Sequence, residues 1–157
     1  MTQEKNLVIK DLCGRLNTEC NTKIITNENE KGYITGVDDV TEGLFNVYIL
    51  EDGEGYCTTM RVEKFKPCLR RLSDMKEKEV DELIDLLNKA CSGRRITKDN
   101  FELTDFGILW FTNMREYECV SHVLMSIVID YLNERQFDYR GLIDMGLAIE
   151  RVINLKK

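Results

Sequence analysis

Five basic residues lie close together between residues 61 and 71, where Glu63 is the only acid. Lysine and arginine side chains form charge-assisted hydrogen bonds with phosphates and carboxylates, so a cluster of them can hold an anion or an acidic partner. The segment therefore predicts a basic binding edge. Its residues are Arg61, Lys64, Lys66, Arg70 and Arg71. In the alternative interpretation these bases are simply the solvated side chains of a strand leaving a sheet.

The tripeptide Asp138-Tyr139-Arg140, which precedes Gly141, is the second candidate site. An aspartate and an arginine can form an ion pair, and a tyrosine can tether a turn to the core, so one interpretation is structural. In the other interpretation Tyr139 and Arg140 are exposed beside the glycine and contact a partner. Both interpretations remain open from the sequence.

His122 and the cysteines are the candidates for catalysis or metal binding. His122 lies four residues before Ser126 and eight before Asp130, but side chains in a row on one helix do not converge as a catalytic triad requires. No cysteine spacing is C-x-x-C, and a single histidine completes no zinc pattern. The usual phosphate, metal and nucleophile motifs are also absent. We therefore expect reduced structural cysteines, no metal and no cofactor, with a Cys–His enzyme as a third-ranked alternative. The cysteines are Cys13, Cys20, Cys57, Cys68, Cys91 and Cys119.

Charge and composition narrow the class of protein. The net charge is −6 and the pI about 5.0, and residues 28–54 hold eight acids against Lys31. This balance disfavours nucleic acid as a partner, although Phe65 beside the basic edge could stack on a base of a single strand. The amino-terminal residues do not show the basic start and hydrophobic segment of a secretion signal, and no apolar run is long enough to span a membrane. We therefore expect a cytoplasmic protein.

The elements that must position these residues divide into two lobes of a single domain, residues 1–72 and 73–157. In the first lobe, a short helix over residues 3–16 precedes strands near 23–25, 33–37, 44–50 and 56–62. Strands this short and closely spaced predict a small, SH3-like antiparallel barrel or a strongly twisted antiparallel sheet. Both faces of the strand at 44–50 are apolar, which predicts packing against helices, and Pro67 marks the expected exit from the sheet.

The second lobe is predicted to be helical, which makes the fold class α+β. Ser73 is the expected N-cap of a helix ending near Ala90. A central helix capped by Asn113 carries apolar residues around most of its circumference over 119–133, so we expect it to be buried in the middle of the core. Turns at Gly141 and Gly146, a short helical piece over 142–145 and a last helix from Leu147 should follow. A homodimer would use that last helix.

Three blocks of the sequence resemble a family of small uncharacterised proteins encoded by phages and mobile elements of Bacteroides-type gut bacteria. The most specific is Y-L-N-E-R-Q-F-D-Y-R-G-L-I-D-M-G-L-A-I (131–149); L-V-I-K-D-L-C-G-R-L (7–16) and K-P-C-L-R-R-L-S-D-M (66–75) support it, as does I-T-G-V-D at 34–38. The chain departs from the family pattern at Cys68, at Arg71 and over 17–22, and 94–118 match nothing in it. The resemblance implies a bacterial host cell and assigns no activity.

Three functions are compatible with these features. The first is a non-enzymatic accessory protein that binds a host or phage protein and interferes with a host process such as defence. The second is a protein that sequesters a small anionic ligand, such as a nucleotide signal, through arginines and lysines. The third is the enzyme that uses His122 or a cysteine.

Overall fold

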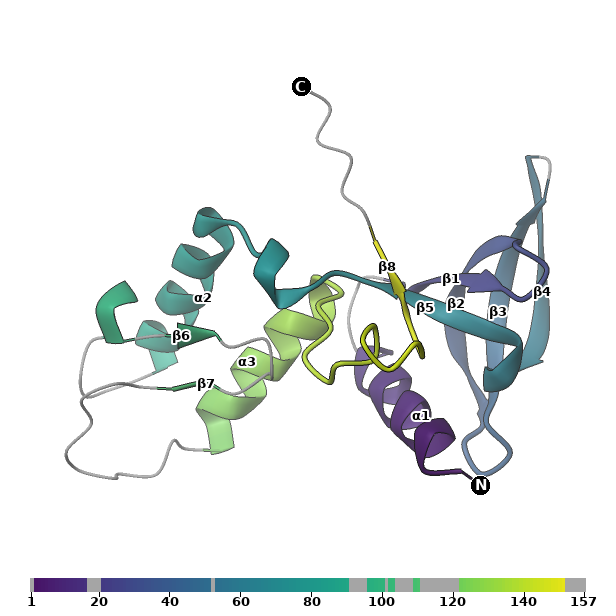
Figure 1. Ribbon diagram of the computed structural model, residues 1–157, viewed down its shortest axis with the longest axis horizontal. Helices are drawn as coiled ribbons and strands as arrows, with labels where there is room; N and C mark the ends of the chain where they lie inside the picture. Colours follow the sequence, from purple (N-terminus) through teal and green to yellow (C-terminus); the bar gives the residue numbers. More distant parts are fainter. Residues whose placement is uncertain are drawn as a thin grey trace.

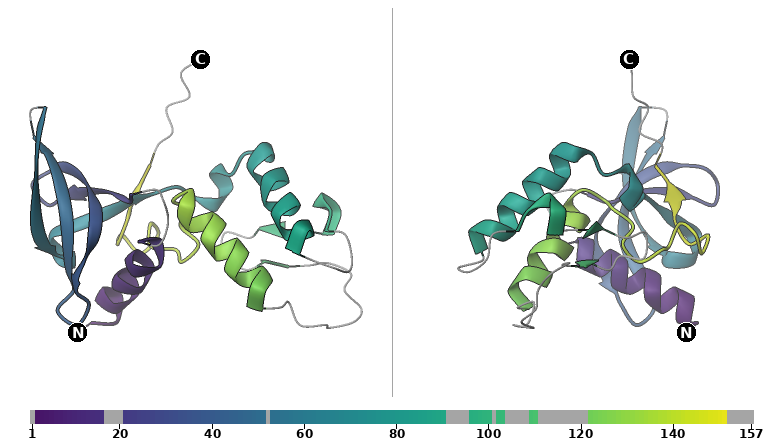
Figure 2. Two further views of the ribbon diagram at one scale, coloured as in Figure 1. Left: turned by 180° about the vertical axis from the view of Figure 1, so that it is seen from behind. Right: turned by 60° about the vertical axis from the view of Figure 1, so that its left-hand side comes forward.

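The computed structural model describes residues 2–16, 21–51, 53–90, 96–100, 102–103, 109–110 and 122–151. Within these ranges the protein is α+β, with three α-helices and a curled, mixed six-stranded sheet that forms a half-barrel (Figure 1). The predicted fold class is confirmed at this level. The sheet and the helix pair lie at opposite ends of the molecule, and the segment after the last helix crosses back to the sheet (Figure 2).

Four strands of the sheet form a meander, the fifth returns to pair with the first, and a sixth is added at that edge. Its strands are β1 (Lys23–Thr26), β2 (Lys31–Asp39), β3 (Leu44–Glu51), β4 (Glu54–Arg61), β5 (Phe65–Leu69) and β8 (Ile149–Glu150). Their spatial order is β4-β3-β2-β1-β5-β8, and only the β5–β8 pair is parallel. The prediction for Pro67 is wrong, because it lies inside β5 opposite Ile24. Val62 lies in a short 3-10 helix (Val62–Lys64) rather than in β4.

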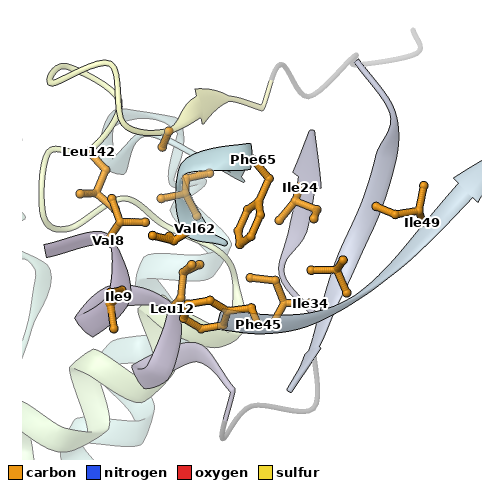
Figure 3. Close-up of a cluster of buried hydrophobic side chains, with 13 residues drawn as sticks. Val8, Ile9, Leu12, Ile24, Ile34, Phe45, Ile49, Val62, Phe65 and Leu142 are labelled. Atoms are coloured by element: carbon orange, nitrogen blue, oxygen red, sulfur yellow. The ribbon is translucent and has the colours of Figure 1, made fainter. Parts of the chain in front are cut away.

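The core of this lobe lies on the concave face of the sheet, under α1 (Gln3–Arg15). Alternate residues of β3 point inward, and Phe45, Val47 and Ile49 are fully buried. Val8, Ile9 and Leu12 of α1 and Phe65 belong to the same cluster, and Figure 3 shows Leu12 beside Phe45. The outward residue Leu50 is 51% exposed. The predicted packing of the sheet against a helix is therefore found on the inner face, under α1, while the outward apolar residue Leu50 of β3 remains half-exposed.

The helical lobe has a core of its own. Helices α2 (Glu77–Ala90) and α3 (His122–Glu134) pack together through Leu83, Leu87 and Leu132. Among the α3 residues whose burial is described, 125–134, the buried ones lie on one side: Met125 is 40% exposed, and Ser126 and Asp130 are also exposed. The extended apolar face predicted for this helix is therefore wrong at Met125, because α3 contributes to the core of the helical lobe and not to the separate core of the sheet lobe. The predicted cap at Asn113 lies outside the described residues.

The start of α2 also differs from the prediction. Ser73 is in a short 3-10 helix (Leu72–Asp74), and α2 begins at Glu77, three residues after the end of that helix. There the carboxylate of Glu79 accepts from the backbone N–H of Lys76 at 2.9 Å. A glutamate in the first turn that reaches back to the residue before the helix supplies half of a capping box. Glu79, not Ser73, therefore fixes the start of this helix.

The segment after α3 returns to the sheet. Gly141 and Gly146 both have a φ of 70°, as predicted, and hydrogen-bonded turns fill residues 142–146. No helix follows. Leu142 and Ala148 are buried in the sheet core, and β8 pairs with β5. The prediction of a last helix from Leu147 is wrong, so the helix through which a dimer was predicted to form is not found there.

The remaining described elements are small. A 3-10 helix (Lys98–Asn100) precedes β6 (Glu102–Leu103), which pairs antiparallel with β7 (Leu109–Trp110). Among the described helices, none has both the length and the apolar character that crossing a bilayer requires.

Candidate binding site

Two of the five residues of the predicted basic edge carry an exposed ion pair and two have no ion pair. Arg61 contacts Glu42 at 3.0 Å, and Arg71 contacts both Asp144 at 2.7 Å and Glu150 at 3.0 Å. Lys66 Nζ donates to the carbonyl of Gly146 at 2.7 Å. Lys64 is exposed and forms no ion pair within the described residues. The positive charge of this edge is thus largely neutralised by neighbouring acids.

The fifth residue, Arg70, is not on the surface. It is 7% exposed, and its two terminal nitrogens donate to the two carboxylate oxygens of Glu79 at 2.8 and 2.9 Å. Its guanidinium lies 4.2 Å from the ring centre of Phe137. The hydrogen bond from Arg70 is the main cause that holds the pKa of Glu79 below its ordinary value. Phe65, the predicted stacking residue, is 3% exposed in the sheet core, so that prediction is wrong.

The Asp138-Tyr139-Arg140 tripeptide forms a turn in which Asp138 is buried and the other two residues are half-buried. Both oxygens of the Asp138 carboxylate accept from backbone N–H groups, including those of Leu142 at 2.9 Å and Ile143 at 2.7 Å. Arg140 pairs with Asp11 of α1 at 3.3 Å and lies over the Tyr139 ring. The structural interpretation fits these contacts, although the partner of Arg140 is Asp11 and not Asp138.

Sequence reasoning missed the charged pair inside α1. Asp11 and Arg15 are both buried, and Arg15 donates to Asp11 at 2.6 and 3.0 Å and to the carbonyl of Phe137 at 2.8 Å. The pair joins the sheet lobe to the end of α3. A signal was present: Arg15 stands three residues after Leu12 and seven after Val8, on the apolar face of the helix, with an aspartate four residues before it.

The outer edge of β4 has no partner among the described strands, and β4 ends the sheet (Figure 1). The N–H of Val62 donates to the carbonyl of Gly43 at 2.9 Å, just beyond the β3–β4 ladder. Because bonded and non-bonded pairs alternate in an antiparallel ladder, residues 55, 57, 59 and 61 turn their backbone groups to the open edge. Such an edge can accept a further strand.

Carboxylates gather beside this edge around Tyr56. Its hydroxyl lies 3.4 Å from Glu30, and a cavity of about 460 Å³ opens next to Glu51, Glu54, Gly55 and Tyr56. Partial loss of solvent raises the pKa of Tyr56, and the negative charges of Glu30, Glu51 and Glu28 raise it further. Within the described residues, none of these carboxylates forms an ion pair. The acid-rich stretch was visible in the sequence, but the fold was needed to place it at a sheet edge.

Packing on the outer face of the sheet explains the glycine at position 55, near the start of β4. The ring of Tyr48 stacks on Tyr33 with centroids 5.2 Å apart and covers Gly55, where a Cβ would overlap the Tyr48 ring. A glycine is therefore required for this arrangement of the outer face. The next residue, Tyr56, points to the opposite face of the sheet and is 43% exposed.

Comparisons with family models, with curated proteins and with solved structures found no match to this chain. Within the described residues, no group of three or more potential metal ligands is present. Cys13, Cys57 and Cys68 have free thiols, while Cys20, Cys91, Cys119 and the side chain of His122 lie outside the described residues. The function is therefore inferred from the β4 edge and its surroundings.

Proposed function

We propose that this protein is a non-enzymatic binding protein whose β4 edge takes up an extended, basic segment of a partner protein as an additional strand. The observation that carries this proposal is the coincidence of an unpaired strand edge with unpaired carboxylates around Tyr56. An added strand would satisfy the outward backbone groups of β4, which supplies affinity that is independent of sequence.

Charge and ring chemistry select the side chains of the partner. A lysine or arginine near Tyr56 would meet the carboxylates of Glu30, Glu51 and Glu54 and the face of the tyrosine ring. Cation–π contacts contribute about 0.5–1 kcal/mol at exposed sites, and complementary charge accelerates association and suppresses acidic competitors. The partner segment is therefore basic and extended.

The finer features of the fold and the biological setting belong to the same proposal. The half-barrel supports, as a hypothesis, an SH3-like arrangement of the sheet lobe, with α3 as the element that links it to the helical lobe. From the F-D-Y-R-G-L-I resemblance we infer an accessory protein of a phage or mobile element, acting in the bacterial cytoplasm on a host or phage protein and interfering with a host process such as defence.

Peptide titration followed by amide NMR tests the proposal. The probe is a peptide of alternating lysine and valine, and the matched peptide replaces lysine with glutamate. We expect saturable shifts in residues 54–61 with the basic peptide and none with the acidic one. Absence of saturable shifts, or shifts confined to another face, would overturn the β4 proposal.

Charge reversal then separates the site from general electrostatics. Glu51→Lys with Glu54→Lys removes the acidic side of the edge, and we expect at least tenfold weaker peptide binding. The control, Asp38→Lys with Asp85→Lys, makes the same change in net charge at exposed residues that form no ion pair in the described structure. Equal weakening in both variants would mean that the peptide responds only to net charge.

The backbone part of the proposal has its own variant. Thr59→Pro removes an outward N–H, and proline is tolerated on edge strands where the N–H faces solvent. We expect this variant to keep the unfolding transition of the wild type and to lose the shifts in β4. The charge-reversal result decides the proposal if Thr59→Pro does not fold.

A further inference from the structure

A cavity of about 430 Å³ lies on the other side of the sheet from β4, between β1, β5, the end of α3 and the residue that follows β8. Four basic residues line it, and Glu134 is the only acid in its described lining, so the local balance is +3. The basic residues are Lys23, Arg70, Arg135 and Arg151. Of these four residues, only Arg70 was a candidate in the sequence. The four lie in separate parts of the chain that only the fold brings together.

Two of the four cations have no partner. Within the described residues, the side chains of Lys23 and Arg151 form no ion pair and no hydrogen bond. Arg135 is occupied by Glu82 at 2.8 Å and Glu134 at 3.6 Å. The cavity thus combines two uncompensated charges with a cation that is already fixed in place.

Arg70 adds a buried donor. Its terminal nitrogens are held by Glu79, but its Nε is buried and has no hydrogen-bond partner. An unpaired buried N–H is costly, so such groups are normally satisfied by a ligand or an ordered water. The amide side chains of Asn21 and Gln136 line the same cavity.

We propose that this cavity binds the phosphate group of a small phosphorylated compound. Lys23 and Arg151 supply the charge that neutralises a dianion, and the Arg70 guanidinium, held rigidly by Glu79, supplies a directed donor. The volume is within the range of small-ligand sites. No aromatic ring belongs to the described lining, so the site recognises the phosphate rather than a base.

The thiol of Cys68 is compatible with an anionic ligand. Burial raises the pKa of Cys68, while the charges of Arg151 and Lys23 act in the opposite direction. Both cations therefore lie near one thiol. Because the net shift is upward, the thiol stays protonated at neutral pH and adds no negative charge that would repel a phosphate.

Calorimetric titration at low ionic strength tests this site with inorganic phosphate, pyrophosphate, ribose 5-phosphate and, as the non-phosphorylated probe, ribose. We expect saturable binding of the phosphorylated probes and none of ribose. The pocket variant is Lys23→Gln with Arg151→Gln, which removes two unpaired cations and leaves the Arg70–Glu79 pair in place. We expect its affinity to fall at least about tenfold.

The matched control is Lys10→Gln with Lys89→Gln, two exposed lysines that form no ion pair in the described structure. It should bind phosphate as the wild type does. Equal loss in control and pocket variant, or no saturable binding by the wild type, would overturn the inference. The pocket variant should still shift β4 amides with the lysine–valine peptide, so failure here and failure of the proposed function are separate results.

Discussion

Two charged pairs that join the lobes, Arg15–Asp11 and Arg70–Glu79, are largely buried, whereas Glu51 and Glu54 beside Tyr56 at the β4 edge are exposed and form no ion pair within the described residues. At the junction, Arg15 and Asp11 have side chains that are 0% exposed, and Arg70 is held by Glu79. At the edge, Tyr56 is 43% exposed among carboxylates that have no cation in the described structure. The buried charges therefore neutralise each other, and the carboxylates at the edge remain available to a cationic partner.

The difference follows from the energetics of burying charge. Removing one partner of a buried pair leaves the other uncompensated and costs about 3–5 kcal/mol, whereas an exposed pair contributes about 0–1 kcal/mol. Charges at the junction can thus be changed only with a large effect on stability. Those at the edge can be changed with little effect, which is what a binding surface requires.

The largest effect is expected at Arg15. Arg15→Met leaves the buried carboxylate of Asp11 with only Arg140, so the free energy of unfolding should fall by about 3–5 kcal/mol in urea denaturation. The double variant Asp11→Leu with Arg15→Met removes both charges and should recover most of this loss. A single variant that unfolds within about 1 kcal/mol of the wild type would show that the pair is not important for stability.

The same contrast explains which parts of the fold were predictable. Local patterns placed α1 and the first four strands, because alternation and turn residues are read over a few positions. The concave core follows from the same alternation at Phe45, Val47 and Ile49. Hydrophobic periodicity also identified α3, but it did not show that Met125 faces solvent, since the division of apolar residues between two clusters is a tertiary property.

The features that could not be predicted depend on contacts between residues far apart in the sequence. Ile149 and Glu150 are strand only because β5 offers them an edge, and the preceding apolar spacing equally suits a helix. Arg70 and Arg71 are neighbours in the sequence, yet one is buried against Glu79 and the other is on the surface. The cationic cavity required four separate parts of the chain to meet. No spacing rule contains that information.

Arg70 should show the next largest effect. Arg70→Met removes the two-point contact with Glu79 and the contact with the Phe137 ring, and leaves a carboxylate whose side chain is 17% exposed. Because that carboxylate keeps some contact with water, we expect a loss of about 2–3 kcal/mol, less than at Arg15. Thermal and urea unfolding of the two variants side by side gives the comparison. A loss larger than that of Arg15→Met would contradict the ranking by burial.

The Arg70–Glu79 pair should also make the stability of the protein depend on pH, with a smaller effect than its removal. The pKa of Glu79 is lowered in the folded protein, mainly by the hydrogen bond from Arg70. Its contribution is therefore present above the pKa of the unfolded chain and is lost as the pH falls through the folded pKa. Glu79→Gln should be less stable than the wild type at pH 7, and the difference in the free energy of unfolding should shrink as the pH falls. Urea curves from pH 7 to pH 3 measure it. A difference that grows toward low pH would contradict the assignment.

The smallest effect is expected at Arg71, the neighbour of Arg70. Arg71 contacts Asp144 and Glu150, and these two acids raise the pKa of its guanidinium, but its side chain is 38% exposed and its partners are more so. Water and salt screen both contacts, so Arg71→Ala should change the free energy of unfolding less than any other variant in this comparison. The measurement is urea unfolding at low and at high salt, where the small loss should shrink further. If Arg71→Ala matched Arg70→Met, burial would not be what separates charges that hold the lobes together from charges that stay free at the surface.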